Sequence, residues 1–320
     1  MKKTISIILV IVVALFGCRK TNKQNSKNEL IIFHAGSLSV PLREISALFM
    51  KEHPEVTVKA EAAGSRHCAR KITELGRRCD ILASADYKVI DNLIIPEHAD
   101  YNIRFAMNEM VIAYNENSNF SDIINAHNWY DILLRRRVTF GRSDPDSDPC
   151  GYRTLMVFQL AEKYYKSKDL ANKLTAKDDL KYVRPKETDL LVLLEAGQID
   201  YIVIYRSVAK QHGLKMIHLP DQVNLKSSEF DDLYKTAQVK VTGKKPGEFI
   251  VRKGQQMIYS VTIPKNAENQ KVAEKWLQLL LSPRGQAVME KNGQPVITPA
   301  LADNFEDLPD KLKPLCRKSF

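Results

Sequence analysis

The sequence predicts an α/β protein with largely parallel sheets. Short apolar runs of strand length alternate along the chain with longer stretches whose apolar residues recur every three or four positions, as in helices. Residues 199–205 form a near-continuous apolar run, typical of a strand that is covered on both faces. Strands and helices that alternate in this way favour parallel sheets flanked by helices.

In the first part of the chain, strands are expected at residues 30–33, 56–60, 81–83 and 110–114. A helix opens at Pro41, because proline suits the first helical turn, and it stops at Pro54. Its apolar face consists of Leu42, Ile45, Leu48 and Phe49. A second helix is expected over residues 66–75, with Gly76 at its end.

The second part of the chain continues the alternation. Strands are expected at residues 138–140, 199–205 and 257–263, whereas residues 220–255 are polar and irregular. A loop over residues 141–151 leads into a helix with Leu155, Phe158, Ala161 and Tyr165 on one side. Residues 189–196 form a short helix that stops at Gly197. Asn266 caps a later helix, and the last predicted helix follows Pro283 and ends near Gly293.

Residues 1–17 are predicted to be a signal peptide. Lys2 and Lys3 precede an apolar run, residues 5–16, that is shorter than the roughly 18–20 residues of a membrane span. The end of this run, Leu-Phe-Gly before Cys18, resembles the lipobox of bacterial lipoproteins, in which that cysteine carries lipid. An ordinary signal peptide with an incidental cysteine is the alternative. Residues 18–28 are polar and charged, which predicts a flexible tether.

The remaining chain of about 300 residues suits two domains. The net charge of +10 would fit a nucleic-acid partner, but an exported chain with acidic residues throughout is better read as having a mildly basic surface. We therefore expect no nucleic-acid partner. The sequence contains no Walker loop, no nucleophile elbow and no HExxH motif.

Four cysteines follow Cys18: Cys68, Cys79, Cys150 and Cys316. Export would permit disulfides, and Cys68 and Cys79 are close enough in sequence to pair, but free thiols remain the alternative. His67 precedes Cys68, yet no metal-ligand spacing accompanies it, so we expect no zinc site.

Three predicted strand-to-helix turns share small and hydroxylic residues: Gly36-Ser37, Gly64-Ser65 and the segment 148–151, Asp-Pro-Cys-Gly. A helix start offers unpaired N–H groups and a positive dipole end, so such turns can bind a small anion without lysine or arginine. Plain helix capping is the alternative for each turn. A hydrolase that uses Ser37 or Ser65 as nucleophile would need an oriented base, and none is recognisable.

Several segments closely resemble the archaeal-type molybdate/tungstate-binding proteins of ABC transporters. They lie in order between about residue 30 and residue 300, at 33–38, 63–65, 69–72, 80–87, 148–153, 184–190, 199–201 and 205–209. The resemblance implies the type II periplasmic-binding protein fold, with two α/β lobes joined by two crossing strands. Lobe I would hold residues 29–112 and 262–320, lobe II residues 113–261, and the crossing strands residues 110–114 and 257–263.

The resemblance also implies a set of ligand-contacting residues: Ser37, Ser65, Asp148, Pro149, Cys150, Glu187 and Tyr205. Asp148 and Glu187 would coordinate the tungsten or molybdenum of the oxyanion, an expansion that sulfur and phosphorus cannot make. Three of these residues also have a purely structural interpretation. Asp148 could be a helix N-cap, Glu187 a partner of a helix dipole, and Tyr205 a core residue.

The implied function is that of a binding protein rather than an enzyme. An exported, membrane-anchored monomer would capture tungstate or molybdate, without a cofactor, for an ABC permease whose ATPase is a separate chain. A binding protein for another small anion, such as sulfate, and an anion sensor are the alternatives. The sequence does not separate tungstate from molybdate, because the two ions have nearly the same size and charge.

Overall fold

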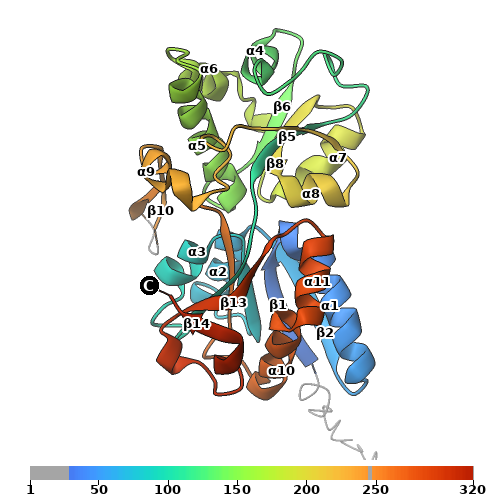
Figure 1. The fold of residues 1–320 in the computed structure, drawn as a ribbon, viewed down its shortest axis with the longest axis vertical. Helices are drawn as coiled ribbons and strands as arrows, with labels where there is room; N and C mark the ends of the chain where they lie inside the picture. Colours follow the sequence, from blue (N-terminus) through green and yellow to red (C-terminus); the bar gives the residue numbers. More distant parts are fainter. Residues whose placement is uncertain (1–28, 244–246, 320) are drawn as a thin grey trace, which may run out of the picture.

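The computed structural model describes residues 29–243 and 247–319 of the protein. In these residues the strands form a seven-stranded sheet, a five-stranded sheet and a two-stranded hairpin. Figure 1 shows two lobes, one below the other. We call the part around the seven-stranded sheet lobe I and the part around the five-stranded sheet lobe II. The predicted signal peptide and tether lie outside the described residues.

Lobe I contains both the first and the last elements of the described chain, and α1, α2, α10 and α11 lie around its sheet (Figure 1). Its sheet order is β14-β13-β4-β12-β3-β1-β2. The strands are β1 (Glu29–Ala35), β2 (Thr57–Ala63), β3 (Ile81–Ser84), β4 (Asn102–Met107), β12 (Ile258–Thr262), β13 (Val296–Asp303) and β14 (Cys316–Lys318). The helices are α1 (Ser39–Glu52), α2 (Ser65–Thr73), α3 (Tyr87–Leu93), α10 (Gln270–Leu281) and α11 (Pro283–Lys291), with short 3₁₀ turns η2 (Gly36–Leu38), η6 (Phe305–Asp307) and η7 (Lys313–Leu315).

Lobe II is built from the middle of the chain, with sheet order β7-β6-β8-β5-β9. The strands are β5 (Met110–Tyr114), β6 (Phe140–Ser143), β7 (Val183–Arg184), β8 (Tyr201–Tyr205) and β9 (Lys215–His218). The helices are α4 (Trp129–Leu134), α5 (Pro149–Tyr164), α6 (Leu170–Lys177), α7 (Leu190–Glu195) and α8 (Arg206–Gln211), with 3₁₀ turns η3 (Leu180–Tyr182) and η4 (Glu187–Asp189). All five residues of β8 are buried, as its apolar sequence predicts.

The chain crosses between the lobes twice. The first crossing is at Asn108 and Glu109, between β4 of lobe I and β5 of lobe II. The expected lobe boundary after residue 112 falls inside β5, all of which pairs within lobe II. The second crossing precedes β12, which pairs with β3 and β4 of lobe I. Both crossings come directly before a strand that the sequence predicts.

Both sheets are mixed, so the prediction of largely parallel sheets is wrong. In lobe I, β12 is antiparallel to β3 and β4, and in lobe II, β5 is antiparallel to β8 and β9. These are the strands that follow the two crossings. In each lobe, the strands that lead into helices have their carboxyl ends toward the other lobe. A strand that enters from the crossing starts at that same end, so it runs in the opposite direction.

Residues 220–255, predicted to be irregular, contain η5 (Ser228–Phe230), α9 (Asp231–Tyr234) and a hairpin of β10 (Gln238–Thr242) with β11 (Phe249–Lys253). In β10 the residues alternate between exposed and buried, the period of a half-buried strand. Figure 1 places α9 and β10 at the side of the junction between the lobes. The cap of α10 also differs from its prediction, because Asn269 occupies the N-cap and Asn266 donates to the carbonyl of Arg77.

Large buried side chains fill the interior of each lobe, among them Trp129 in lobe II and Trp276 in lobe I. Along the part of the chain that the structure describes, every helix is too short or too polar to cross a bilayer.

Candidate functional site

All seven residues predicted to contact a ligand are buried, and they lie where the two lobes meet. Ser37 and Ser65 come from lobe I, in the turns after β1 and β2. Asp148, Pro149 and Cys150 start α5, Glu187 starts η4, and Tyr205 ends β8, all in lobe II.

Two glycines let the lobes approach at this junction. A Cβ on Gly36 would lie 2.9 Å from Oε2 of Glu187, and one on Gly64 would lie 2.3 Å from the carbonyl oxygen of Ser147. Atoms of lobe II therefore occupy the space that any larger residue would need. The His67 N–H also donates to that Ser147 carbonyl at 3.2 Å. The structure thus has the two lobes in direct contact.

Neither serine caps its helix. The N-cap positions are Ala35 and Gly64, and no side chain caps either element. The Ser37 Oγ instead accepts a hydrogen bond from the hydroxyl of Tyr259 at 3.0 Å, and the Ser65 Oγ accepts from the Ala85 N–H at 2.9 Å. Plain capping therefore does not account for the two serines.

Asp148 does cap α5, as its plainer reading holds, but it also makes a second contact. Its Oδ1 accepts from the Cys150 N–H at 3.3 Å, and its Oδ2 accepts from the Glu187 N–H at 3.0 Å. Burial raises the pKa of the Asp148 carboxyl. Because the aspartate joins the α5 turn to the η4 turn, its position depends on both.

Glu187 is fully buried, and neither of its carboxylate oxygens has a hydrogen-bond partner within 29–243 and 247–319. Burial raises the pKa of this carboxyl well above its ordinary value, and the negative charge of Asp148 raises it further. A buried charge without donors is costly. Glu187 starts η4, so its plainer reading as a partner of that helix dipole stays an alternative.

Tyr205 is held by a residue that the sequence reasoning missed. Nη1 of the buried Arg153 donates to the Tyr205 Oη at 3.0 Å and to the Ala85 carbonyl at 2.7 Å, and Nη2 lies 3.6 Å from a carboxylate oxygen of Asp86. Because Ala85 and Asp86 belong to lobe I, Arg153 joins the lobes behind the site. It lies one helical turn after Pro149, a spacing that could have indicated its inward direction.

The four cysteines of the described chain are buried free thiols. Cys68 donates to the carbonyl of His34 at 3.4 Å, and Cys79 donates to that of Ile81 at 3.0 Å, so the pairing of these two cysteines that the sequence left open is not present. Burial raises the pKa of Cys68 to about 12. Over the same residues, no three His, Cys, Asp or Glu side chains gather in a way that would hold a metal ion.

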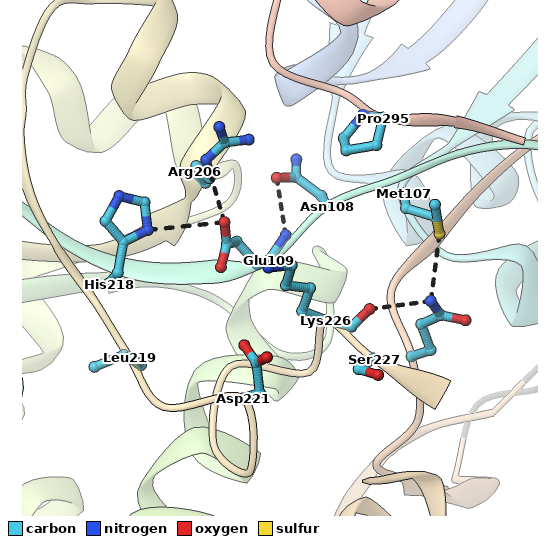
Figure 2. A pocket seen from close by; sticks show the side chains of 11 residues that line it. Met107, Asn108, Glu109, Arg206, His218, Leu219, Asp221, Lys226, Ser227 and Pro295 are labelled. Atoms are coloured by element: carbon cyan, nitrogen blue, oxygen red, sulfur yellow. Dashed lines mark hydrogen bonds and ion pairs between the residues drawn. The ribbon is translucent and has the colours of Figure 1, made fainter. Parts of the chain in front are cut away.

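A cavity of about 730 Å³ opens beside the first crossing. Figure 2 shows the side chains that line it. Glu109 projects into it and pairs with Arg206 at 3.1 Å and with His218 at 3.8 Å. None of the seven predicted residues lines this cavity. The cavity and the predicted residues are therefore separate features: Glu109 and Arg206 line the first, whereas the predicted residues are buried.

Comparisons with known proteins agree with this architecture. Residues 30–294 match the family model of bacterial extracellular solute-binding proteins. An uncharacterized solute-binding protein of Petrotoga mobilis is 50% identical over 98% of this chain and 97% of its own length. The molybdate/tungstate-binding protein WtpA of Pyrococcus abyssi is 40% identical over 96% of each chain.

Among solved structures, the periplasmic molybdate-binding protein of Azotobacter vinelandii superposes with a TM-score of 0.61 at 15% identity, covering 83% of this chain and 98% of its own. This likeness confirms the predicted two-lobed fold of periplasmic-binding proteins. With the family model and the close relatives, it shows that the chain belongs to the extracellular solute-binding protein family, a family of binding proteins rather than enzymes.

Proposed function

We propose that this protein captures tungstate or molybdate outside the cytoplasm and delivers it to an ABC importer. The permease and the ATPase of that importer would be separate chains. Support comes from identities of 40% and 39% to molybdate/tungstate-binding proteins of Pyrococcus abyssi and Thermococcus kodakarensis, each over 96% of this chain. The proposed ligand residues are Ser37, Ser65, Asp148, Pro149, Cys150, Glu187 and Tyr205.

The observation that carries the proposal is the Glu187 carboxylate, which is fully buried, has no hydrogen-bond partner among the described residues and feels the negative charge of Asp148. For an anion with a saturated centre, two carboxylates are a penalty, because like charges at 4 Å repel by about 1 kcal/mol even in water. A tungsten or molybdenum centre differs, since it can accept further oxygen ligands. Carboxylates that are costly in the free protein then become donors to the metal of the oxyanion.

The same arrangement would reject sulfate and phosphate. Their central atoms cannot take up the oxygens of Asp148 and Glu187, so binding would bury unpaired negative charge. The serine hydroxyls would donate to the oxo groups of any such ion and would not discriminate by themselves. Selectivity would therefore reside in the two acids, through attraction to one class of anion and repulsion of the other.

The proposed site lies between two lobes, which fits capture by closure. Ser37 and Ser65 of lobe I and the acids of lobe II can all contact one small ion only when the lobes are together. An ion that makes contacts with both lobes stabilises the closed form over the open one. The closed form would be the one that docks on the permease.

Residues 1–28, which lie outside the described residues, would direct and hold the protein at the membrane. We propose that residues 1–17 are a signal peptide, that Cys18 carries lipid and that residues 18–28 are the tether, with the folded part a monomer facing the periplasm or the cell exterior. Mass spectrometry of the protein from membranes would detect the lipid on Cys18. Release of a Cys18→Ala variant into the soluble fraction would agree with this role.

Calorimetric titration with tungstate, molybdate, sulfate and phosphate tests the proposed ligand. We expect tight binding of the first two anions and none of the others at millimolar concentration. X-ray absorption at the tungsten edge should report more than four oxygen neighbours in the complex. Comparable affinities for sulfate and tungstate, or a four-coordinate bound ion, would contradict the proposal.

A further inference from the structure

A chain of buried hydrogen bonds runs from Ser37 to the first crossing between the lobes. Ser37 contacts Tyr259 of β12, Tyr259 contacts Asn108 of the crossing, and Asn108 contacts Ser207 at the start of α8. All four side chains are at most 3% exposed. Its ends lie in different lobes, and its middle lies on the segment that joins them.

Asn108 fixes the direction of this chain. Its Oδ1 accepts from the backbone N–H of Glu109 at 2.9 Å and from that of Ser207 at 3.3 Å. A backbone N–H can only donate, so these contacts assign the oxygen and the nitrogen of the amide without ambiguity. Figure 2 shows the amide oxygen directed at the Glu109 nitrogen.

The amide nitrogen must therefore donate both of its hydrogens. Nδ2 lies 2.7 Å from the Ser207 Oγ and 2.7 Å from the Tyr259 Oη. Since the tyrosine oxygen accepts from Asn108, its single hydrogen is free to be donated to the Ser37 Oγ, which lies at 3.0 Å. The orientation of the Asn108 amide therefore also determines which group donates in the hydrogen bond between Tyr259 and Ser37, in the turn after β1.

Ser37 is the last residue in this series of hydrogen bonds. Its oxygen accepts from Tyr259, so its own hydrogen is left for another acceptor. The Ser65 oxygen is also occupied as an acceptor, in this case by the backbone N–H of Ala85. In both serines the oxygen already accepts one hydrogen bond, and the hydroxyl hydrogen remains to be donated.

We propose that Asn108 and Tyr259 are positioning residues that hold Ser37 as a hydrogen-bond donor to the bound oxyanion. This inference rests on the proposed function. A serine hydroxyl without such a partner rotates among several directions and can act as donor or acceptor. Fixing it before binding removes that freedom, so less free energy is lost when the anion arrives.

The test is a double-mutant cycle on the full chain, with tungstate binding measured by competition calorimetry. Tyr259→Phe leaves Ser37 without the contact that fixes it and should weaken binding about tenfold, the usual scale for the hydrogen bond that Ser37 would donate to a charged ligand. Ser37→Ala should weaken binding too. In the Ser37→Ala background, Tyr259→Phe should change the dissociation constant less than twofold, because Tyr259 acts through Ser37.

Tyr101→Phe is the matched control, because it removes another buried tyrosine hydroxyl of lobe I that has no partner among the described residues. It should leave tungstate affinity unchanged. Asn108→Asp is a second variant, since it keeps the acceptor for both backbone N–H groups but cannot donate to Tyr259. We expect it to weaken binding at least as much as Tyr259→Phe.

The outcomes separate this inference from the function on which it rests. If the unaltered protein binds none of the oxyanions, the proposed function fails and the inference fails with it. If the unaltered protein binds tungstate and Tyr259→Phe binds equally well, only the inference is overturned. It is also overturned if the effects of Tyr259→Phe and Ser37→Ala add, because the tyrosine would then support the fold rather than the donor.

Discussion

The backbone N–H of Glu187 donates to Oδ2 of Asp148 at 3.0 Å, and this bond joins two acidic residues from separate turns of lobe II. The aspartate gains a donor from it, whereas the glutamate carboxylate receives none within the described chain. The two carboxylates therefore differ in the hydrogen-bond donors that the protein supplies to them. Asp148 accepts two backbone N–H groups, although burial still raises the pKa of its carboxyl, and we expect the partner of Glu187 to come from the ligand.

Glu187→Gln should stabilise the ligand-free protein at neutral pH while abolishing tungstate binding. The folded pKa of Glu187 lies above its ordinary value of 4.5, so the folded state holds its proton to higher pH than the unfolded state does. Wild-type stability therefore falls as pH rises from about 4.5 through the folded pKa. At pH 7.5 the variant should gain about 1–3 kcal/mol, the usual cost of burying an unpaired polar group.

The gain should disappear below pH 4.5, where both folded and unfolded wild-type chains carry the proton. Urea unfolding of the two proteins between pH 4 and pH 8 measures this difference. Glu195→Gln, at an exposed position of the same lobe, is the control and should show no gain. A Glu187→Gln protein that is less stable than wild type at pH 7.5 would mean that the carboxylate is satisfied in the free protein.

Asp148→Asn separates the capping role of this residue from its proposed ligand role. Asparagine is as good an N-cap as aspartate, so it can still accept from the Cys150 N–H, and the unfolding temperature should fall only slightly. Tungstate affinity should fall by about 100-fold or more, the scale for loss of a buried charged partner. Calorimetry and thermal unfolding of the same sample provide both values, and full affinity would leave Asp148 as a cap alone.

The elements with strong patterns could be predicted from the sequence. The strand at Met110–Tyr114 has the predicted bounds, and β8 and α5 follow the apolar runs that indicated them. The β10–β11 hairpin was missed because residues 220–255 were judged by their polarity, although the alternation in β10 was present. Strand direction was also mispredicted, because hydrophobic periodicity reports which face is buried and not which way a strand runs.

The site could be predicted only in part. The glycine-serine turns and the acids were found from local motifs and from the resemblance to a family. Arg153, Asn108 and Tyr259 were missed, because each acts through a partner far away in the chain: Asn108 contacts Tyr259 across 151 positions. Such contacts depend on how the lobes assemble, and no spacing within one segment reports them.

The free cysteines predict a simple chemical result. Alkylation of the denatured, unreduced protein should modify Cys68, Cys79, Cys150 and Cys316, because all four are thiols. In the native protein they should react slowly, since they are buried and burial raises the pKa of each thiol. Peptide mass spectrometry identifies the modified positions. If Cys68 and Cys79 remained unmodified until a reductant was added, a disulfide between them would be present after all.

Gly64→Ala should impair closure of the lobes more than it impairs folding. A Cβ at this position would meet the carbonyl oxygens of Ser147 at 2.3 Å and Pro185 at 2.8 Å, both across the junction. Backbone atoms cannot move aside as a flexible side chain can, so the lobes would have to stay apart. The three atoms nearest to the added methyl all belong to lobe II, so we expect the unfolding free energy to change by only about 0.5 kcal/mol.

With the lobes held apart, the serines of lobe I and the acids of lobe II could not contact one ion together, so tungstate affinity should fall by about 100-fold or more. Small-angle scattering should show wild type contracting on addition of tungstate and the Gly64→Ala protein remaining extended. Gly197→Ala is the matched control: it places a methyl where nothing lies within 4 Å but strains a residue with φ of +67°. That control should lose stability and keep its affinity, whereas a Gly64→Ala protein that contracts and binds like wild type would show that closure does not require this contact.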